Sequence, residues 1–205
     1  MFRKSTMKNG LFSFRSRGYI PHYEADGHAQ LITYRLNDSL PAAVLVGLDE
    51  ELEHDFQRSK EIERVRHIEE CLDKGAGSCV LANHSIAQVI EQNLLHFEEK
   101  RYKLHAWVIM PNHVHVLITP AHGVRLPIVV HSWKSYTAKK ANTILGLQGE
   151  FWQREYFDRM IRSERHFAYT IAYIHNNPVK AGLCRNPEDW QFSSAAQFSQ
   201  SLGNE

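Results

Sequence analysis

MPNHVHVLIT, residues 110–119, places two histidines two positions apart in an otherwise apolar run. Side chains along a β-strand alternate between its two faces, so His113 and His115 point to the same side of a predicted strand. Pro111 and Asn112 are typical of a turn, which puts the pair at the start of that strand. Two neighbouring imidazoles can provide half of a divalent-metal site. The tripeptide alone favours the other reading, two hydrogen-bonded polar side chains at a sheet edge.

The segments on either side of this run predict an α+β protein. Alternating β-forming residues predict strands over 30–36 and 102–109, the second pairing with the histidine strand as a hairpin, and a short strand over 151–153. Apolar residues spaced three and four apart predict helices over 48–73, 86–99, 126–145 and 166–176. Ser163 is expected to cap the last helix, and Pro178 and Gly182 to end it. This order predicts a mostly antiparallel sheet with helices on one face.

Composition restricts the class of protein. With 205 residues, 43% of them hydrophobic, a single domain spanning 1–205 is expected. No apolar run reaches the roughly 20 residues of a membrane helix, and the basic N-terminus lacks the apolar segment of a secretory signal. Three cysteines without a Cys-x-x-Cys pair argue against a disulfide framework and against a thiolate zinc site. A cytoplasmic protein is expected, with no membrane partner.

Charge is segregated along the chain, although the net charge is only +1. Residues 1–23 form a basic N-terminal arm with no acidic residue, 24–100 are strongly acidic, and 101–185 are strongly basic. The histidine pair lies in the basic part. Lysine and arginine around a candidate metal site favour a polyanionic substrate. Solvation of helix faces would explain scattered charges well, but this segregation less well.

A second group of candidate site residues lies on the last predicted helix. Tyr169, Tyr173 and Asn177 are four residues apart and therefore share one helix face. The side-chain oxygen of Asn177 could bind a cation, and Tyr173 one turn earlier could act as a nucleophile. Its ordinary pKa of about 10 means that a nearby cation or base must favour the phenolate. Spacing alone favours an ordinary amphipathic helix that buries both tyrosines.

Two motifs resemble a known family. His113-Val114-His115 matches the His-hydrophobe-His motif of the HUH single-tyrosine transposases, and YIHNNPVKAGL, residues 173–183, is similar to the nucleophile helix of their REP-associated branch. Residues 18–23, 107–112 and 152–159 also resemble that branch, and matches extend from about 18 to 195. The histidine motif alone is weak, but both motifs in this order, about sixty residues apart, are specific.

The resemblance implies a ferredoxin-like fold that carries a metal-dependent nuclease and strand transferase. It makes Tyr173 the nucleophile that becomes joined to a 5′-phosphate and frees a 3′-OH, with His113, His115 and Asn177 as metal ligands. Asn177 stands where transposon relatives often have glutamine, one methylene longer. The cofactor would be Mg²⁺ or Mn²⁺, and imidazole ligands favour Mn²⁺. Residues 49–99 would be a helical insertion, and their acidity suggests that they do not line the DNA path.

Single-stranded or hairpin DNA is the expected partner, bound by a monomer or a homodimer. The candidate phosphate contacts are Lys134, Lys139, Lys140, Arg154, Arg159 and Arg162. Trp133 and Tyr136 could stack on bases, although core packing is an equal prospect for Trp133.

Two other functions remain open. A protein of the same fold could bind structured nucleic acid without cutting it, but binding does not require a tyrosine one turn before a metal ligand. A zinc hydrolase could use His113 and His115, but it needs a further histidine or a carboxylate. The sequence offers no clean candidate, since His122 and His131 are unplaced.

Overall fold

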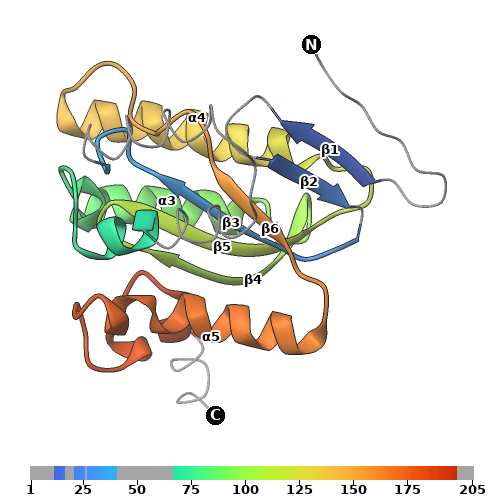
Figure 1. Cartoon of the computed structure of the whole chain (residues 1–205). Coiled ribbons are helices and arrows are strands. Elements are labelled where there is room, and N and C mark those ends of the chain that lie inside the picture. The colour runs from blue at the N-terminus through green and yellow to red at the C-terminus, as the bar shows by residue number, and fades with distance from the viewer. Residues whose placement is uncertain (1–11, 17–20, 26, 41–66, 198–205) are drawn as a thin grey trace, which may run out of the picture.

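The computed structural model describes residues 12–16, 21–25, 27–40 and 67–197 (Figure 1). Its strands are β1 (Phe12–Ser16), β2 (Pro21–Ala25), β3 (Gln30–Arg35), β4 (Tyr102–Ile109), β5 (His113–Pro120) and β6 (Phe157–Met160). Its helices are α3 (His84–His96), α4 (Leu126–Leu145) and α5 (Glu164–Lys180), with short 3-10 turns at Val80–Ala82 and Pro187–Asp189. Residues 67–73 are also helical.

The sheet has the order β4-β5-β3-β6, and every pair in it is antiparallel. Its strands and the helices between them follow the chain order β3-α3-β4-β5-α4-β6. This is a βαββαβ unit with the two hairpin strands β4 and β5 separated in sequence from β3 and β6 by helices. The expected ferredoxin-like α+β class is confirmed. β1 and β2 pair with each other in a separate antiparallel hairpin. The predicted N-terminal arm, residues 1–23, therefore contains β-structure.

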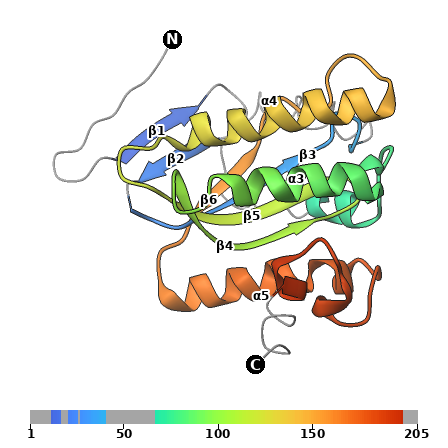
Figure 2. The same cartoon turned by 180° about the vertical axis from the view of Figure 1, so that it is seen from behind.

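Helices cover both faces of this sheet. α3 and α4 lie together on one face, while α5 lies on the other (Figures 1 and 2). The prediction of helices on one face therefore holds for the two helices of the βαββαβ unit and is wrong for α5. The reason is visible in β5, where seven of eight residues are buried. A strand covered on both faces has no polar side that would reveal the second layer.

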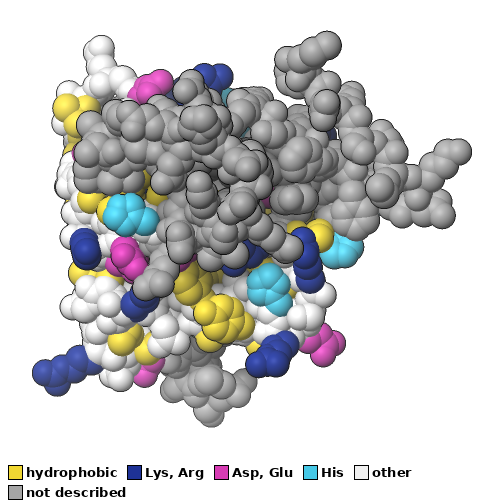
Figure 3. Space-filling view, viewed as in Figure 1, with side chains coloured by type: hydrophobic (Ala, Val, Ile, Leu, Met, Phe, Trp, Pro, Cys, Tyr) yellow, Lys and Arg dark blue, Asp and Glu magenta, His cyan; other side chains and the backbone are white. Residues whose placement is uncertain are grey.

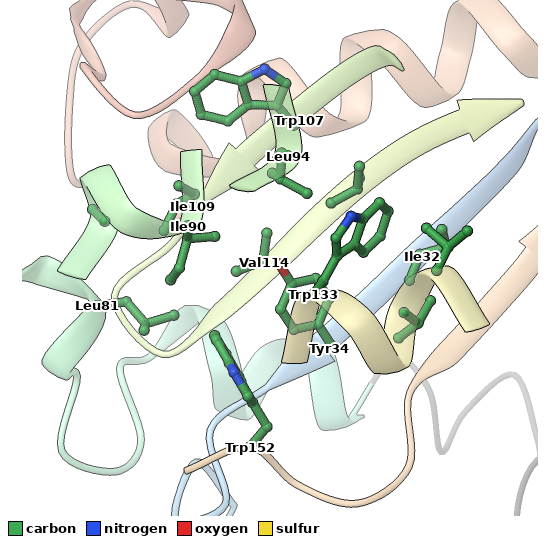
Figure 4. Close-up of a cluster of buried hydrophobic side chains, with 14 of the residues drawn as sticks. Ile32, Tyr34, Leu81, Ile90, Leu94, Trp107, Ile109, Val114, Trp133 and Trp152 are labelled. Carbon is green, nitrogen blue, oxygen red and sulfur yellow. The ribbon is translucent and has the colours of Figure 1, made fainter. Parts of the chain in front are cut away.

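The larger core lies between the sheet and α3 and α4 (Figure 4). Trp133 is fully buried there, and its Nε1 donates to the Tyr102 hydroxyl at 3.0 Å. Trp152 Nε1 donates to Thr137 Oγ1 at 2.9 Å. The indole of Trp133 is therefore core, and the suggestion that it stacks on bases is wrong. A smaller cluster between the sheet and α5 contains Val108, Leu117 and Ile174.

Helix ends follow the local sequence closely, with one exception. The Ser163 side chain accepts from His166 N at 3.1 Å, which caps α5 as expected. Pro178, however, does not end α5, because the helix continues to Lys180 before Gly182 takes a φ of 72°. A proline in the last turn loses a single ladder hydrogen bond, so the helix can continue past it.

The sequence predicted the last strand of the sheet at the wrong position, over 151–153. Trp152, in the segment where a short strand was expected, makes a single bridge to Leu36. The fourth strand instead forms at Phe157–Met160, where two charged residues stand between two apolar ones and show no alternation. A four-residue edge strand is too short for periodicity to separate it from a loop.

The predicted insertion over 49–99 is only partly described, because residues 41–66 lie outside the described ranges. Its later part is no insertion, since α3 is the first crossover helix of the βαββαβ unit. No helix in the described ranges has both the length and the hydrophobicity that a membrane span requires.

The segment after α5 returns to the free edge of β4. Ile109 N donates to Phe192 O at 2.9 Å, and Val108 forms a bridge with Ser193. Trp190 Nε1 donates to Ile109 O at 3.0 Å. These contacts fasten the C-terminal part of the described chain to the sheet.

Gly77 provides a test of how tightly the loop after residue 73 approaches the turn that follows β3. Its φ is +90°, and a Cβ there would lie 2.7 Å from Asp38 O. Gly123 also has a positive φ, of +73°, but faces open space. Gly123→Ala should lose about 1–2 kcal/mol of unfolding free energy from backbone strain alone. Gly77→Ala should lose at least about 1 kcal/mol more. Chemical denaturation measures both, and equal losses would contradict the close approach.

Candidate active site

His113 and His115 lie side by side on β5 and face α5. In the sheet register His113 is opposite Arg35 and His115 is opposite Thr33. Each histidine is 1% exposed, and their Nε2 atoms are 3.0 Å apart. Burial lowers the pKa of both imidazoles, and nearby cationic Lys180 lowers it further; the pKa of His115 falls to about 3. Both rings are therefore neutral at physiological pH, the form that binds metals.

A second layer of side chains holds the outer nitrogen of each ring. Asn112 Oδ1 is 2.7 Å from His113 Nδ1, and Thr33 Oγ1 is 2.7 Å from His115 Nδ1. Metal-binding histidines usually have such an outer partner, which fixes the ring and directs the other nitrogen at the cation. Because both Nδ1 atoms have such partners, the Nε2 atoms of the two rings point toward each other.

Helix α5 brings Tyr173 and Asn177 to the histidine pair. The rings of Tyr173 and His115 are 5.3 Å apart at 70°. Asn177, one turn later, is 1% exposed and lies beside Tyr173. Neither polar atom of the Asn177 amide has a hydrogen-bond partner among the described residues. A buried amide without a partner is costly, so it is best explained by a group that binds there.

Glu69 is a site residue that sequence reasoning missed. It is hydrogen-bonded to Tyr173, whose pKa is raised first by burial and then by the charges of Glu69 and Asp73. Asp73, one turn later on the same helical segment, forms a 2.7 Å salt bridge with Lys180 on α5. The acidity of residues 49–99 suggested that they do not line the DNA path, yet two of these acids lie at the site, against Tyr173 and Lys180. Their spacing indicates a shared helix face, but nothing in the sequence indicates what that face meets.

The residues present fit a divalent cation. Two neutral imidazoles and one free amide oxygen form a mixed nitrogen–oxygen donor set, which suits Mn²⁺ and accepts Mg²⁺. Within the described ranges, no cluster of three or more His, Cys, Asp or Glu side chains could hold a metal. The third histidine or carboxylate that a zinc hydrolase requires is therefore missing from this part of the chain.

The six predicted phosphate-binding residues lie in different places. Lys134 is half-buried and donates to Gln153 O at 2.6 Å and Arg154 O at 2.7 Å, so it ties α4 to the segment before β6. Burial lowers its pKa to about 8. Exposed Lys139 and Lys140 lie on α4, across the sheet from the histidines.

Exposed Arg154, Arg159 and Arg162 lie in or beside β6 and before α5. Arg159 is close enough to Glu69 to lower the pKa of that carboxyl, whose larger shift is a rise caused by burial. Figure 3 shows basic and histidine side chains gathered over the end of β6 and the start of α5. Of the six residues, Arg159 is the one linked to the site, because its charge acts on Glu69, the hydrogen-bond partner of Tyr173.

Stability should depend on pH through the histidine pair. Both imidazoles are held neutral in the native protein, whereas in the unfolded chain they take a proton near pH 6.5. Below that pH the unfolded chain binds more protons, so stability falls as pH falls. Between pH 7 and pH 5 His115 should remove about 2 kcal/mol of unfolding free energy, and His113 should act in the same direction.

Denaturation of metal-free protein at the two pH values measures this loss. His115→Asn should shrink the difference between them, while replacement of exposed His131 by asparagine should leave it unchanged. An undiminished difference in His115→Asn would show that other groups cause the pH dependence.

Part of the chain is similar to known proteins. Residues 80–177, from the turn before α3 to Asn177, match the family model "Transposase IS200 like". A "REP-associated tyrosine transposase" of Escherichia coli (strain K12) is 28% identical over 96 residues, which cover 47% of this chain and 56% of that protein. The chain thus matches a little more than half the length of this curated relative.

A solved structure shares the fold. It is described as "Structure of the REP associates tyrosine transposase bound to a REP hairpin", and it aligns with a TM-score of 0.56 and 20% identity. The alignment covers 86% of this chain and 81% of the other. At this identity the likeness concerns the fold.

Proposed function

We propose that this chain, which carries a transposase IS200-like domain at residues 80–177, cleaves and rejoins single-stranded DNA through a covalent bond to Tyr173. The observation that carries the proposal is the contact between Tyr173 and His115. One turn away lies the Asn177 amide, which has no hydrogen-bond partner among the described residues. A protein that only binds nucleic acid has no need of a tyrosine against a buried histidine pair. The non-catalytic alternative on the same fold is therefore disfavoured.

In the proposed reaction Tyr173 Oη attacks the phosphorus of one phosphodiester. A new phosphotyrosine bond forms on the 5′-phosphate, the bond to the 3′ oxygen breaks, and that oxygen takes a proton from water to become a 3′-OH. Glu69, hydrogen-bonded to Tyr173, is placed to accept the phenol proton. The covalent bond conserves the energy of the phosphodiester, so a 3′-OH can reverse the step.

His113, His115 and Asn177 would hold the cation, either Mg²⁺ or Mn²⁺, which when bound would offset charge on the phosphate oxygens. The need for it follows from the environment of Tyr173. Burial and the two neighbouring carboxylates raise the pKa of this hydroxyl above its ordinary value, so without added positive charge it stays protonated. Arg35, opposite His113, and Lys180 contribute fixed positive charge nearby.

The proposed substrate is DNA with a hairpin and a single-stranded flank, in line with the hairpin named for the solved relative. The flank would cross the surface over the end of β6 and the start of α5, where basic side chains gather (Figure 3). Arg159 in β6 and Arg162 just before α5 are both exposed. Tyr169, 71% exposed and one turn before Tyr173, is available to stack on a base. The proposal places the protein in the cytoplasm, as a monomer or a homodimer.

A trapping assay tests the chemistry. A DNA hairpin with a single-stranded flank, labelled at its 3′ end, is incubated with Mn²⁺ and then denatured. The label should remain attached to the protein. Tyr173→Phe should abolish the adduct because no nucleophile remains, and His115→Ala should reduce it at least about 100-fold. Tyr169→Phe is the matched control and should form the adduct normally.

Three results would contradict the proposal. An adduct in Tyr173→Phe would assign the nucleophile to another residue. Cleavage without an adduct would favour a hydrolase, and tight binding without cleavage would favour the non-catalytic alternative.

The salt dependence of binding tests the DNA path. With Tyr173→Phe as the background, Arg159→Ala and Arg162→Ala should each lower the slope of log K against log salt concentration by about one unit, because each removes one phosphate contact. Arg185→Ala, at an exposed position beyond α5, should leave the slope unchanged. Fluorescence anisotropy over a salt series provides the measurement. Unchanged slopes in both test variants would place the DNA elsewhere.

A further inference from the structure

We propose that Asn112 is a positioning residue that locks His113 in its cation-binding tautomer, and that His115 changes tautomer when a cation binds. The second half rests on the proposed metal site, whereas the first concerns the protein alone. The proposal follows from a hydrogen-bonded chain that runs from Thr33 through both histidines to Asn112.

The orientation of the Asn112 amide is fixed from outside. Asn112 is fully buried, and its Nδ2 donates to Leu72 O at 3.0 Å and to Ala76 O at 2.8 Å. The reverse orientation would set Oδ1 against two carbonyl oxygens, which cannot donate. Asn112 Oδ1 must therefore be the atom 2.7 Å from His113 Nδ1.

This orientation decides which nitrogen of His113 carries the hydrogen. Oδ1 only accepts, so His113 Nδ1 must donate to it. A neutral imidazole has one N–H, and His113 Nε2 is consequently left with a lone pair. This is the tautomer that can bind a cation through Nε2, and it exists before any cation arrives.

His115 must take the opposite tautomer in the cation-free protein. Its Nε2 is 3.0 Å from His113 Nε2, which can only accept, so His115 Nε2 donates. Its Nδ1 then accepts from the Thr33 hydroxyl at 2.7 Å. Every donor in the chain points the same way, from Thr33 through His115 and His113 to Asn112 and the two carbonyls.

Cation binding through both Nε2 atoms requires His115 to change to the tautomer that carries its hydrogen on Nδ1. Its hydrogen leaves Nε2 for water and Nδ1 takes one from water, so the ring stays neutral. Nδ1 then donates to Thr33 Oγ1. A hydroxyl can rotate from donor to acceptor, whereas the Asn112 amide cannot turn. The two outer partners thus have different roles. Asn112 fixes the tautomer of His113, and the Thr33 hydroxyl can hydrogen-bond to either tautomer of His115.

Nitrogen-15 NMR of histidine-labelled protein tests both halves without DNA. In metal-free protein His113 should carry its hydrogen on Nδ1 and His115 on Nε2, and diamagnetic Mg²⁺ should move the His115 hydrogen to Nδ1 while His113 is unchanged. Hydrogen on His113 Nε2 in the metal-free protein would overturn the lock. A His115 that keeps its Nε2 hydrogen in saturating Mg²⁺ would overturn the switch.

Variants separate the two tasks. Asn112→Ala should abolish the fixed tautomer of His113 and weaken Mn²⁺ binding, measured by calorimetry, about 10–100-fold. Asn93→Ala, a buried asparagine replaced on α3, is the control for general destabilisation and should bind Mn²⁺ normally. Thr33→Val should weaken Mn²⁺ binding without changing the tautomer of His113, and it decides the case if Asn112→Ala does not fold.

These outcomes are distinguishable from failure of the proposed function. The protein could show the expected tautomers of His113 and His115 and bind Mn²⁺, yet form no DNA adduct. That result would support the tautomer inference and contradict the proposed nuclease function. Normal Mn²⁺ binding in both Asn112→Ala and Thr33→Val would overturn the inference.

Discussion

The position of β5 between β3 and β4 is the constraint on which the site depends. A strand paired on both sides cannot shift its register without breaking two ladders, and a shift of one residue would exchange its two faces. His113 and His115 therefore share the face toward α5, while Val114 and Val116 enter the core under α3 and α4. The same packing that holds the sheet together desolvates the imidazoles and keeps them neutral.

Around the neutral histidine pair, the positive charge of Lys180 on α5 is offset by acidic residues of the helical segment 67–73. Lys180 lies close enough to lower the pKa of both histidines, yet it is paired with Asp73, and Glu69 lies against Tyr173. The helical segment 67–73 thus provides the anionic side of the site and, through Leu72 O, part of the support for Asn112. Its backbone supports Asn112 beside the histidines, and its acidic side chains contact Tyr173 and Lys180 on α5.

The sequence predicted the parts of this site that are local. Period-two alternation identified β4 to the residue, and apolar spacing identified α4 to the residue. Strand and helix periodicity place the histidine pair, Tyr173 and Asn177 on definite faces, and the resemblance to the HUH transposases assigned their roles. Glu69 was missed because its role depends on which helix lies opposite, and β6 because four residues carry too little pattern. Lys134 looked like a surface cation, but its ammonium group is turned toward two carbonyls, which no one-dimensional pattern reveals.

The return of the chain to β4 has a consequence for how copies of the protein can associate. An uncovered edge strand is a template on which another chain can add a strand. Here Phe192 and Ser193 occupy the outer backbone groups of Val108 and Ile109, and Trp107 N donates to Ser194 Oγ at 3.0 Å. Residues 107–109 are thus closed to strand addition by the protein's own chain. A homodimer that extends the sheet across this edge would first have to displace the segment around Trp190, so the fold protects itself here against edge-to-edge aggregation.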